Sequence, residues 1–407
     1  MRRANSISYS TSQYHLVCPQ NQISQLFPGF IIFCFLIALP LLYETPFSDY
    51  ATLLVVFLLC LLAIFGQSYG NIHYKDKKLI YLFCFAIVFL VFLFPLGNSW
   101  LQSAVRIIQY AGCFFAFLFG SKIQITDRAK NISRFLIYLF VVTSLFFWII
   151  TGMPKTNYSF YFANPNTYSA VLLVDFGFLW AMNNKRMHNY LFIVGITFLS
   201  YLTGCRSSLI AIVVFIVFYV LLILLYKKKG ELRFFPKFLL VTIVALLSLF
   251  IFFYPTMLDS PFGQELQNYS LSKFGKLFFS GRNVIWKNLL DAISQKPLFG
   301  YGLDATPRLI YETEFSSHNL YLQIMLQVGI VGFVVLMAPL LFISLRLACI
   351  KSKLSIVFFC FLILILIHEC FEVTFTQNMI ISGLPMWFLL GVGFHENRMN
   401  NYNGQKI

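Results

Sequence analysis

Three polar motifs stand close together in the second half of an otherwise apolar sequence. They are residues 280–286 (SGRNVIW), residues 297–302 (PLFGYG) and the pair His318 and Asn319. The guanidinium of Arg282 can bind phosphate oxygens through two parallel hydrogen bonds, and a histidine can take a proton from a hydroxyl near neutral pH. The pattern therefore indicates a charged site for a phosphate-bearing substrate, with His318 as the candidate general base.

Arg282 stands at the entry of a short amphipathic helix, which the spacing of apolar residues predicts over 283–295. Ser280 or Asn283 is expected to cap this helix, and its N-terminal dipoles would attract an anion. Trp286 is expected in the headgroup zone, with the helix lying along the membrane surface. The other interpretation of Arg282 is a solvated loop residue that pairs with lipid headgroups.

Two further arginines and one aspartate need a reason for their positions. Arg206 lies in a very short turn where cations are scarce, so it either meets an anionic substrate or snorkels to headgroups. Arg106 lies within a predicted membrane span near its outer end, where ionisable groups usually face a cavity or a partner. Asp175 lies deeper in another predicted span. It either pairs with an arginine of the site or marks an ion pathway in a transporter.

A second acidic and basic cluster is formed by His368, Glu369 and Glu372, at the outer end of a predicted span. His368 and Glu372 stand at i and i+4 and would share one helix face. They could orient His318 or receive a proton, or they could simply be hydrated. The outer segments hold no spacing typical of a metal site, and the chain has no P-loop, so we predict neither a metal nor another cofactor.

The scaffold that must position these residues is predicted to be all-α and embedded in a membrane. Hydrophobic residues make up 59% of the sequence and charged residues 11%, with a mean hydropathy of +0.77. Such a composition excludes a soluble globular domain. Apolar runs long enough to cross a bilayer predict a polytopic protein with about twelve transmembrane helices. Their expected positions are 29–43, 50–66, 79–96, 102–120, 135–150, 168–182, 189–203, 207–226, 236–254, 319–345, 354–371 and 379–394.

The distribution of cations predicts the orientation of this bundle. Most of the 30 Lys and Arg residues fall in segments that share one side if the N-terminus is cytoplasmic, so both termini are predicted there. The same placement accounts for the net charge of +15 without nucleic acid. The first span is expected to be retained rather than cleaved, and the nine cysteines show no disulfide framework. The predicted units are a cytoplasmic tail (1–28), nine spans (29–254), one large extracytoplasmic loop (255–318), three spans (319–394) and a cytoplasmic tail (395–407).

One family combines these motifs in this order. Residues 164–166 (NPN) and 203–207 (TGCRS) precede the three motifs described above, and glycines follow at positions 329 and 332. Together the stretch from about 160 to 335 resembles the O-antigen ligase and polysaccharide polymerase superfamily of bacterial multi-pass membrane proteins. The resemblance implies a GT-C-like fold. It places Cys205 where the family pattern has serine.

In that family a basic turn, an arginine in the large loop and a histidine at its end form the active site. Carried over, these are Arg206, Arg282 and His318. The resemblance implies glycosyl transfer at the outer face of the bacterial plasma membrane, from an undecaprenyl-diphosphate-linked oligosaccharide to a sugar hydroxyl. The arginines would bind the diphosphate and His318 would deprotonate the acceptor, with inversion and without a metal. The candidate substrate-binding residues are Arg106, Asn283, Asn319 and His368.

Two activities of this family and one from another class stay open. We favour a polymerase of O-antigen, capsule or exopolysaccharide repeat units over a ligase that transfers a finished glycan to another acceptor. The expected partners are the lipid-linked donor, membrane lipid, a flippase and a chain-length regulator, but no nucleic acid. A transporter of lipid-linked sugars is the third reading. It is less favoured because the polar residues gather on one face, whereas alternating access uses a site near the midplane.

Overall fold

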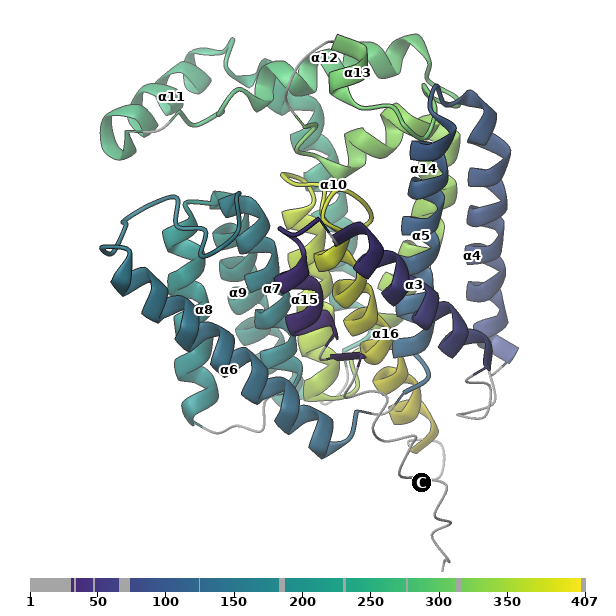
Figure 1. Ribbon diagram of the computed structural model, residues 1–407, viewed down its shortest axis with the longest axis vertical. Coiled ribbons are helices and arrows are strands. Elements are labelled where there is room, and N and C mark those ends of the chain that lie inside the picture. Colours follow the sequence, from purple (N-terminus) through teal and green to yellow (C-terminus); the bar gives the residue numbers. More distant parts are fainter. Residues whose placement is uncertain are drawn as a thin grey trace, which may run out of the picture.

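The computed structural model describes residues 31–403, except for residues 33, 47, 66–73, 124, 183–186, 230–231, 276 and 312–315. The predicted N-terminal tail (1–28) and residues 404–407 lie outside the described residues. Within the described part the chain is a bundle of helices (Figure 1). Its one strand-like feature there is an isolated antiparallel bridge between Leu232 and Ile350. The all-α prediction is therefore confirmed for this part of the chain.

Helices overlap each of the predicted spans. The first coincides with two short elements, η1 (Cys34–Ala38) and α2 (Leu39–Leu42). The longer helices are α3 (Ser48–Phe65), α4 (Tyr74–Leu93), α5 (Trp100–Gly120), α6 (Asp127–Ile150), α7 (Pro165–Ala181), α8 (Met187–Thr203), α9 (Arg206–Lys229), α10 (Phe235–Met257), α14 (Leu320–Leu347), α15 (Lys353–His368) and α16 (Ile380–Asn403). The helix α16 continues past the predicted start of the C-terminal tail at 395.

A polytopic membrane protein is confirmed by length and composition. Six described helices are long and apolar enough to cross a membrane: Lys77–Leu96, Trp100–Gly120, Asp127–Ile150, Arg206–Lys228, Phe235–Met257 and Leu320–Leu347. The helix α15 is apolar but shorter. The number of twelve spans and the placement of the termini stay predictions.

Two helices, α7 and α15, form the centre of the bundle and are buried along nearly their whole length. Close helix packing beside them depends on glycine. A Cβ atom on Gly120 of α5 would lie 2.3 Å from the carbonyl oxygen of Phe388, and one on Gly391 of α16 would lie 2.2 Å from that of Phe117. Small residues let two backbones approach in this way, which is the usual packing device of membrane helices.

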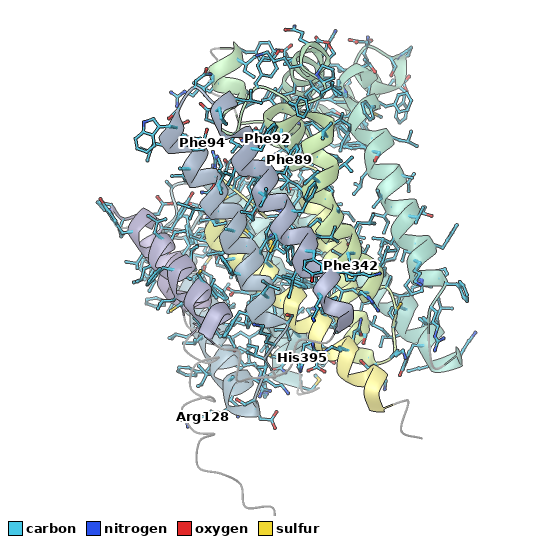
Figure 2. The ribbon with its side chains drawn as sticks, turned by 90° about the vertical axis from the view of Figure 1, so that its right-hand side faces the viewer. Phe89, Phe92, Phe94, Arg128, Phe342 and His395 are labelled. Carbon is cyan, nitrogen blue, oxygen red and sulfur yellow. The ribbon has the colours of Figure 1, made fainter. Side chains whose placement is uncertain are left out.

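The described residues between 258 and 319 cover one end of the bundle, which we call the loop end (Figure 1). They contain α11 (Pro261–Phe274), α12 (Arg282–Gln295) and the short α13 (Pro307–Tyr311). In Figure 2, Phe92 and Phe94 lie towards the loop end, and Arg128 lies at the opposite end. The amphipathic helix predicted over 283–295 is confirmed as α12.

The surroundings of α12 differ from the prediction in two respects. Its N-cap is Gly281, with φ 76° and no side-chain hydrogen bond, so neither Ser280 nor Asn283 caps it. Trp286 is fully buried, and its ring centroid lies 4.7 Å from that of Tyr254. Its indole N–H donates to the Ser317 carbonyl at 3.0 Å. Trp286 therefore packs α12 onto α10 and α14, and its side chain is not exposed to lipid headgroups.

Residues 297–302 fit into a break in α14. Gly329 has φ 62° and ψ −171°, a conformation that essentially only glycine adopts. A Cβ on Gly329 would lie 2.3 Å from the backbone of Leu298, and one on Gly300 would lie 2.6 Å from that of Gln327. Four backbone hydrogen bonds join the segments: Tyr301 N to Leu326 O (2.9 Å), Gly302 N to Gln327 O (3.0 Å), Ile330 N to Pro297 O (2.8 Å) and Val331 N to Leu298 O (3.2 Å). This joint fixes the end of α12 against α14.

Candidate functional site

Arg282 and His318 meet at Glu372, a carboxylate in the turn between α15 and α16. The Arg282 Nη2 lies 2.8 Å from Glu372 Oε1, and the His318 Nδ1 lies 3.2 Å from Oε2. The Asn166 side-chain amide donates to Oε1 at 3.1 Å. Glu372 is only 4% exposed. Four separate elements thus meet at one buried carboxylate. They are the start of α7, the start of α12, the residue pair before α14 and this turn.

A left-handed turn delivers Arg282 to this point. Ser280 and Gly281 both have positive φ, 54° and 76°, so the chain reverses just before α12 begins. The Arg282 N–H donates to the Phe279 carbonyl at 3.0 Å, and the guanidinium carbon lies 5.8 Å from the Phe371 ring centroid. Because no side chain caps α12, the next two N–H groups, those of Asn283 and Val284, can donate to an anion beside the guanidinium.

His318 is placed by the residue that follows it. Asn319 is the N-cap of α14, and its side-chain oxygen accepts the Leu322 N–H at 3.0 Å. Its amide nitrogen donates to the Cys370 carbonyl at 3.0 Å. Asn319 is fully buried, so its side chain holds the start of α14 against the Glu372 turn and presents no surface to a substrate. His318 itself has φ 46°, and its side chain is 27% exposed.

Arg206, at the start of α9, contacts the left-handed turn that precedes α12. Its Nη2 donates to the Leu277 carbonyl at 2.9 Å and to the Ser280 hydroxyl. The residue is exposed, and its charge lies close enough to Arg282 for the two to interact electrostatically. The three residues Arg206, Arg282 and His318 therefore lie together at the loop end.

The remaining candidates lie at varying distances from this cluster. Asn283 is buried in the first turn of α12, next to Arg282. His368 is completely buried, and its imidazole Nδ1 lies 3.2 Å from Glu369 Oε1. Its backbone carbonyl accepts the Glu372 N–H at 3.1 Å. The Arg106 guanidinium donates to the Gln109 side chain at 3.0 Å, and no contact recorded among the described residues joins it to Glu372. Asp175 is buried in α7, and within the described residues no arginine pairs with it.

Opposing influences act on the pKa of Glu372. Burial alone would raise it, but the hydrogen bond to His318 and the positive charge of Arg282 outweigh burial, and the pKa lies below its ordinary value. Glu372 is therefore a carboxylate at neutral pH. An ionised acceptor at Nδ1 favours the histidine tautomer with its proton on that nitrogen, which leaves the Nε2 lone pair of His318 free to accept a proton.

Comparisons with known proteins find similarity in the region of the chain that contains the site. The O-antigen ligase family model matches residues 191–337, a stretch that includes Arg206, Arg282 and His318. A relative is the ComP-specific O-oligosaccharyltransferase of Acinetobacter baylyi, 27% identical over 383 residues, which are 88% of this chain and 63% of that protein. Over residues 191–337 the chain is similar to the O-antigen ligase family. It spans 63% of the length of this relative.

Sequence reasoning undervalued two residues that the structure brings to the centre of the site. Glu372 was expected to share a helix face with His368, but α15 ends at His368 and the carboxylate turns instead to Arg282 and His318. Asn166 stood within the NPN motif only as part of a pattern. It lies at the start of α7, where the residues from Thr167 to Ala181 are all buried.

Proposed function

We propose that this protein transfers a glycan from a lipid-linked diphosphate donor to an acceptor hydroxyl. The observation that carries the proposal is Glu372, which binds the Arg282 guanidinium and the His318 imidazole at once. This arrangement places the His318 imidazole, which can receive a proton, beside the Arg282 guanidinium, which can stabilise negative charge. Similarity to the O-antigen ligase family model and to an oligosaccharyltransferase supports the same class of reaction.

The proposed mechanism is a single displacement. The His318 Nε2 accepts the proton of the acceptor hydroxyl as its oxygen bonds to the anomeric carbon of the donor. The bond from that carbon to the diphosphate oxygen breaks, and its electron pair stays on the leaving diphosphate. Arg282 and Arg206 stabilise the charge that develops there, and Glu372 stabilises the imidazolium. Attack opposite the leaving group gives inversion, and the imidazolium then loses its proton to the diphosphate or to water.

The donor is proposed to be an undecaprenyl-diphosphate oligosaccharide whose lipid chain lies along the bundle. Exposed apolar side chains near the loop end of α10, such as Phe252 and Phe253, provide a surface of the kind that a polyprenyl chain contacts. We place the loop end at the outer face of the bacterial plasma membrane, with both termini in the cytoplasm, because the short loops at that end hold only Lys155 and Arg206. A flippase and a chain-length regulator remain the proposed partners.

For the acceptor, ligase-type transfer is better supported than polymerisation. The family model is described as O-antigen ligase, and the relative is named as an oligosaccharyltransferase. Both descriptions fit transfer of a preassembled glycan to another molecule. The repeat-unit polymerase that we favoured from sequence is the alternative product of the same chemistry, and a product analysis separates the two.

The test is transfer by the purified protein, supplied with a defined undecaprenyl-diphosphate oligosaccharide and a candidate acceptor in the presence of EDTA. Wild type and the control His188→Ala, at an exposed position at the start of α8, should transfer glycan. His318→Ala should bind donor without transferring it. One glycan added per acceptor indicates a ligase, and a ladder built on the lipid indicates a polymerase. Transfer by His318→Ala at the wild-type rate would overturn the mechanism, and donor translocation without a new glycosidic bond would support the transporter instead.

A further inference from the structure

A second carboxylate, Glu369, lies beneath the site without facing it. Glu369 is 1% exposed and follows directly after the end of α15. Its Oε2 accepts the backbone N–H groups of Thr374 at 2.9 Å and Phe375 at 3.1 Å. Its Oε1 accepts the Thr374 hydroxyl and lies 3.2 Å from His368 Nδ1. Four polar groups thus surround one buried carboxyl group, as a polar group in an apolar interior requires.

These bonds close a ring of chain around Glu372. The ring runs from Glu369 to Thr374, and Glu372 lies within it. The end of this ring of chain is anchored to α16. The Phe375 carbonyl accepts the Trp387 indole N–H at 3.0 Å, and the aromatic rings of Phe375 and Trp387 stack with centroids 4.5 Å apart. The Glu369 carboxylate therefore fixes the turn from which the Glu372 side chain reaches Arg282 and His318.

The same ring receives the segment that carries His318. The Leu320 N–H donates to the Glu369 carbonyl at 2.9 Å, and the Asn319 side chain donates to the Cys370 carbonyl at 3.0 Å. Both contacts lie within two residues of His318 along the chain. Both members of the His318–Glu372 pair are thus attached to a turn that Glu369 holds closed.

We infer that Glu369 is a positioning residue that sets the relative placement of Glu372 and His318. This inference rests on the proposed function for its kinetic consequences. The competing explanation is that Glu369 only stabilises the fold, in which case its removal would lower stability and leave the coupling between Glu372 and His318 intact.

A double-mutant cycle separates these explanations. Glu369→Gln keeps the size of the side chain but replaces one acceptor oxygen with a donor. We expect kcat to fall roughly 10- to 100-fold with the KM for donor unchanged, which is the range for partners that orient a reacting group. The double variant Glu369→Gln/Glu372→Gln should be no slower than Glu372→Gln alone, because Glu369 acts through Glu372. Losses that multiply would overturn the inference.

Modification of His318 by diethyl pyrocarbonate, measured site by site with mass spectrometry, provides a readout that does not require transfer. The modification rate in Glu369→Gln should change in the same direction as in Glu372→Gln, with His188 as an unaffected internal control. An unchanged rate at His318 in Glu369→Gln would contradict the inference. If wild type transfers no glycan while this pattern holds, the proposed function fails and the positioning role stands.

A smaller change at Thr374 guards against misfolding of Glu369→Gln. Thr374→Val removes only the hydroxyl donor to Glu369, and Thr374→Ser retains it. The valine variant should show a several-fold lower kcat and altered His318 modification, and the serine variant should match wild type. Equal behaviour of the two variants would remove the support for a Glu369-held turn.

Discussion

Ion pairs occur at both ends of the bundle, and they differ in burial and in the elements they join. At the opposite end Lys130 Nζ lies 3.2 Å from Asp127 Oδ1, and the two side chains are 38% and 93% exposed. At the loop end Arg282 Nη2 lies 2.8 Å from Glu372 Oε1, and these side chains are 20% and 5% exposed. An exposed pair is screened by water and is worth about 0–1 kcal/mol. A buried carboxylate is costly to desolvate, so it persists only with strong partners.

The two pairs also differ in their origin along the chain. Asp127 and Lys130 stand at i and i+3 in the first turn of α6, where an acidic residue also complements the helix dipole. Arg282 and Glu372 are 90 positions apart. A pair of the first kind belongs to one helix, whereas the second requires α12 and the α15–α16 turn to be correctly packed. The loop-end pair is therefore the one that reports on the fold and on the site together.

The largest effect in this comparison is expected for Glu372→Gln. The variant removes the charge that Arg282 and His318 share, and it also removes the acceptor that selects the histidine tautomer. We expect kcat for glycan transfer to fall on the order of 10²–10⁴-fold, as when the orienting carboxylate of a catalytic histidine is lost. Transfer kinetics with purified protein measure this directly. A variant with more than half of wild-type kcat would show that Glu372 does not orient His318.

Next in size is the effect of Gly329→Ala on the joint between residues 297–302 and α14. An added Cβ would lie 2.3 Å from the backbone of Leu298, at a position with φ 62° and ψ −171°. Strain and overpacking together should destabilise the protein by roughly 2–5 kcal/mol. Thermal unfolding in detergent measures the loss. Gly152→Ala is the matched control, since Gly152 also has positive φ but a Cβ there meets nothing within 4 Å.

A smaller, charge-conserving change tests whether Arg206 acts by its geometry. Arg206→Lys keeps the positive charge but loses the fork that donates to Leu277 and Ser280 and that would grip two phosphate oxygens. We expect roughly tenfold weaker transfer with little change in thermal stability, since the residue is exposed. Comparison with Lys155→Arg, in the loop after α6, controls for the substitution itself. Full activity of Arg206→Lys would show that Arg206 acts only through its positive charge and not through the geometry of its guanidinium.

The scaffold was largely predictable from sequence, while the centre of the site was not. Apolar runs and flanking polar residues located the long helices, and periodicity located α12 to within one residue. The motif that contains Gly300 indicated a tight turn, but it did not indicate that this turn fits into a break in α14. The need for glycine there comes from the backbone of Gln327, which a Cβ would contact, and the sequence does not show that contact. Glu372 was likewise visible as a polar residue, yet its bonds to Asn166, His318 and Arg282 depend on which helix ends meet.

Acid should weaken the loop-end pair through Glu372. Burial opposes its ionisation, but the His318 hydrogen bond and the Arg282 charge lower its pKa below the ordinary value of 4.5. The stabilisation is therefore present above about pH 4.5 and is lost as pH falls through the lower pKa of the folded protein. The difference in melting temperature between wild type and Glu372→Gln should shrink as pH falls from 7 to 3.5. A difference that grows in acid would contradict the assigned sign.

The smallest effect is expected for Asp127→Asn, the counterpart of Glu372→Gln at the opposite end. The variant removes an ion pair of similar length, but its carboxylate is 93% exposed and its partner 38% exposed. Solvent screening leaves only the weak pair and the helix-dipole contribution, so stability should change by about 0.5 kcal/mol or less, and transfer should be unaffected. Both are measured in the assays used for Glu372→Gln. If Asp127→Asn slowed transfer as much as Glu372→Gln did, burial would not be what separates the two pairs, and the activity would depend on the overall charge of the protein.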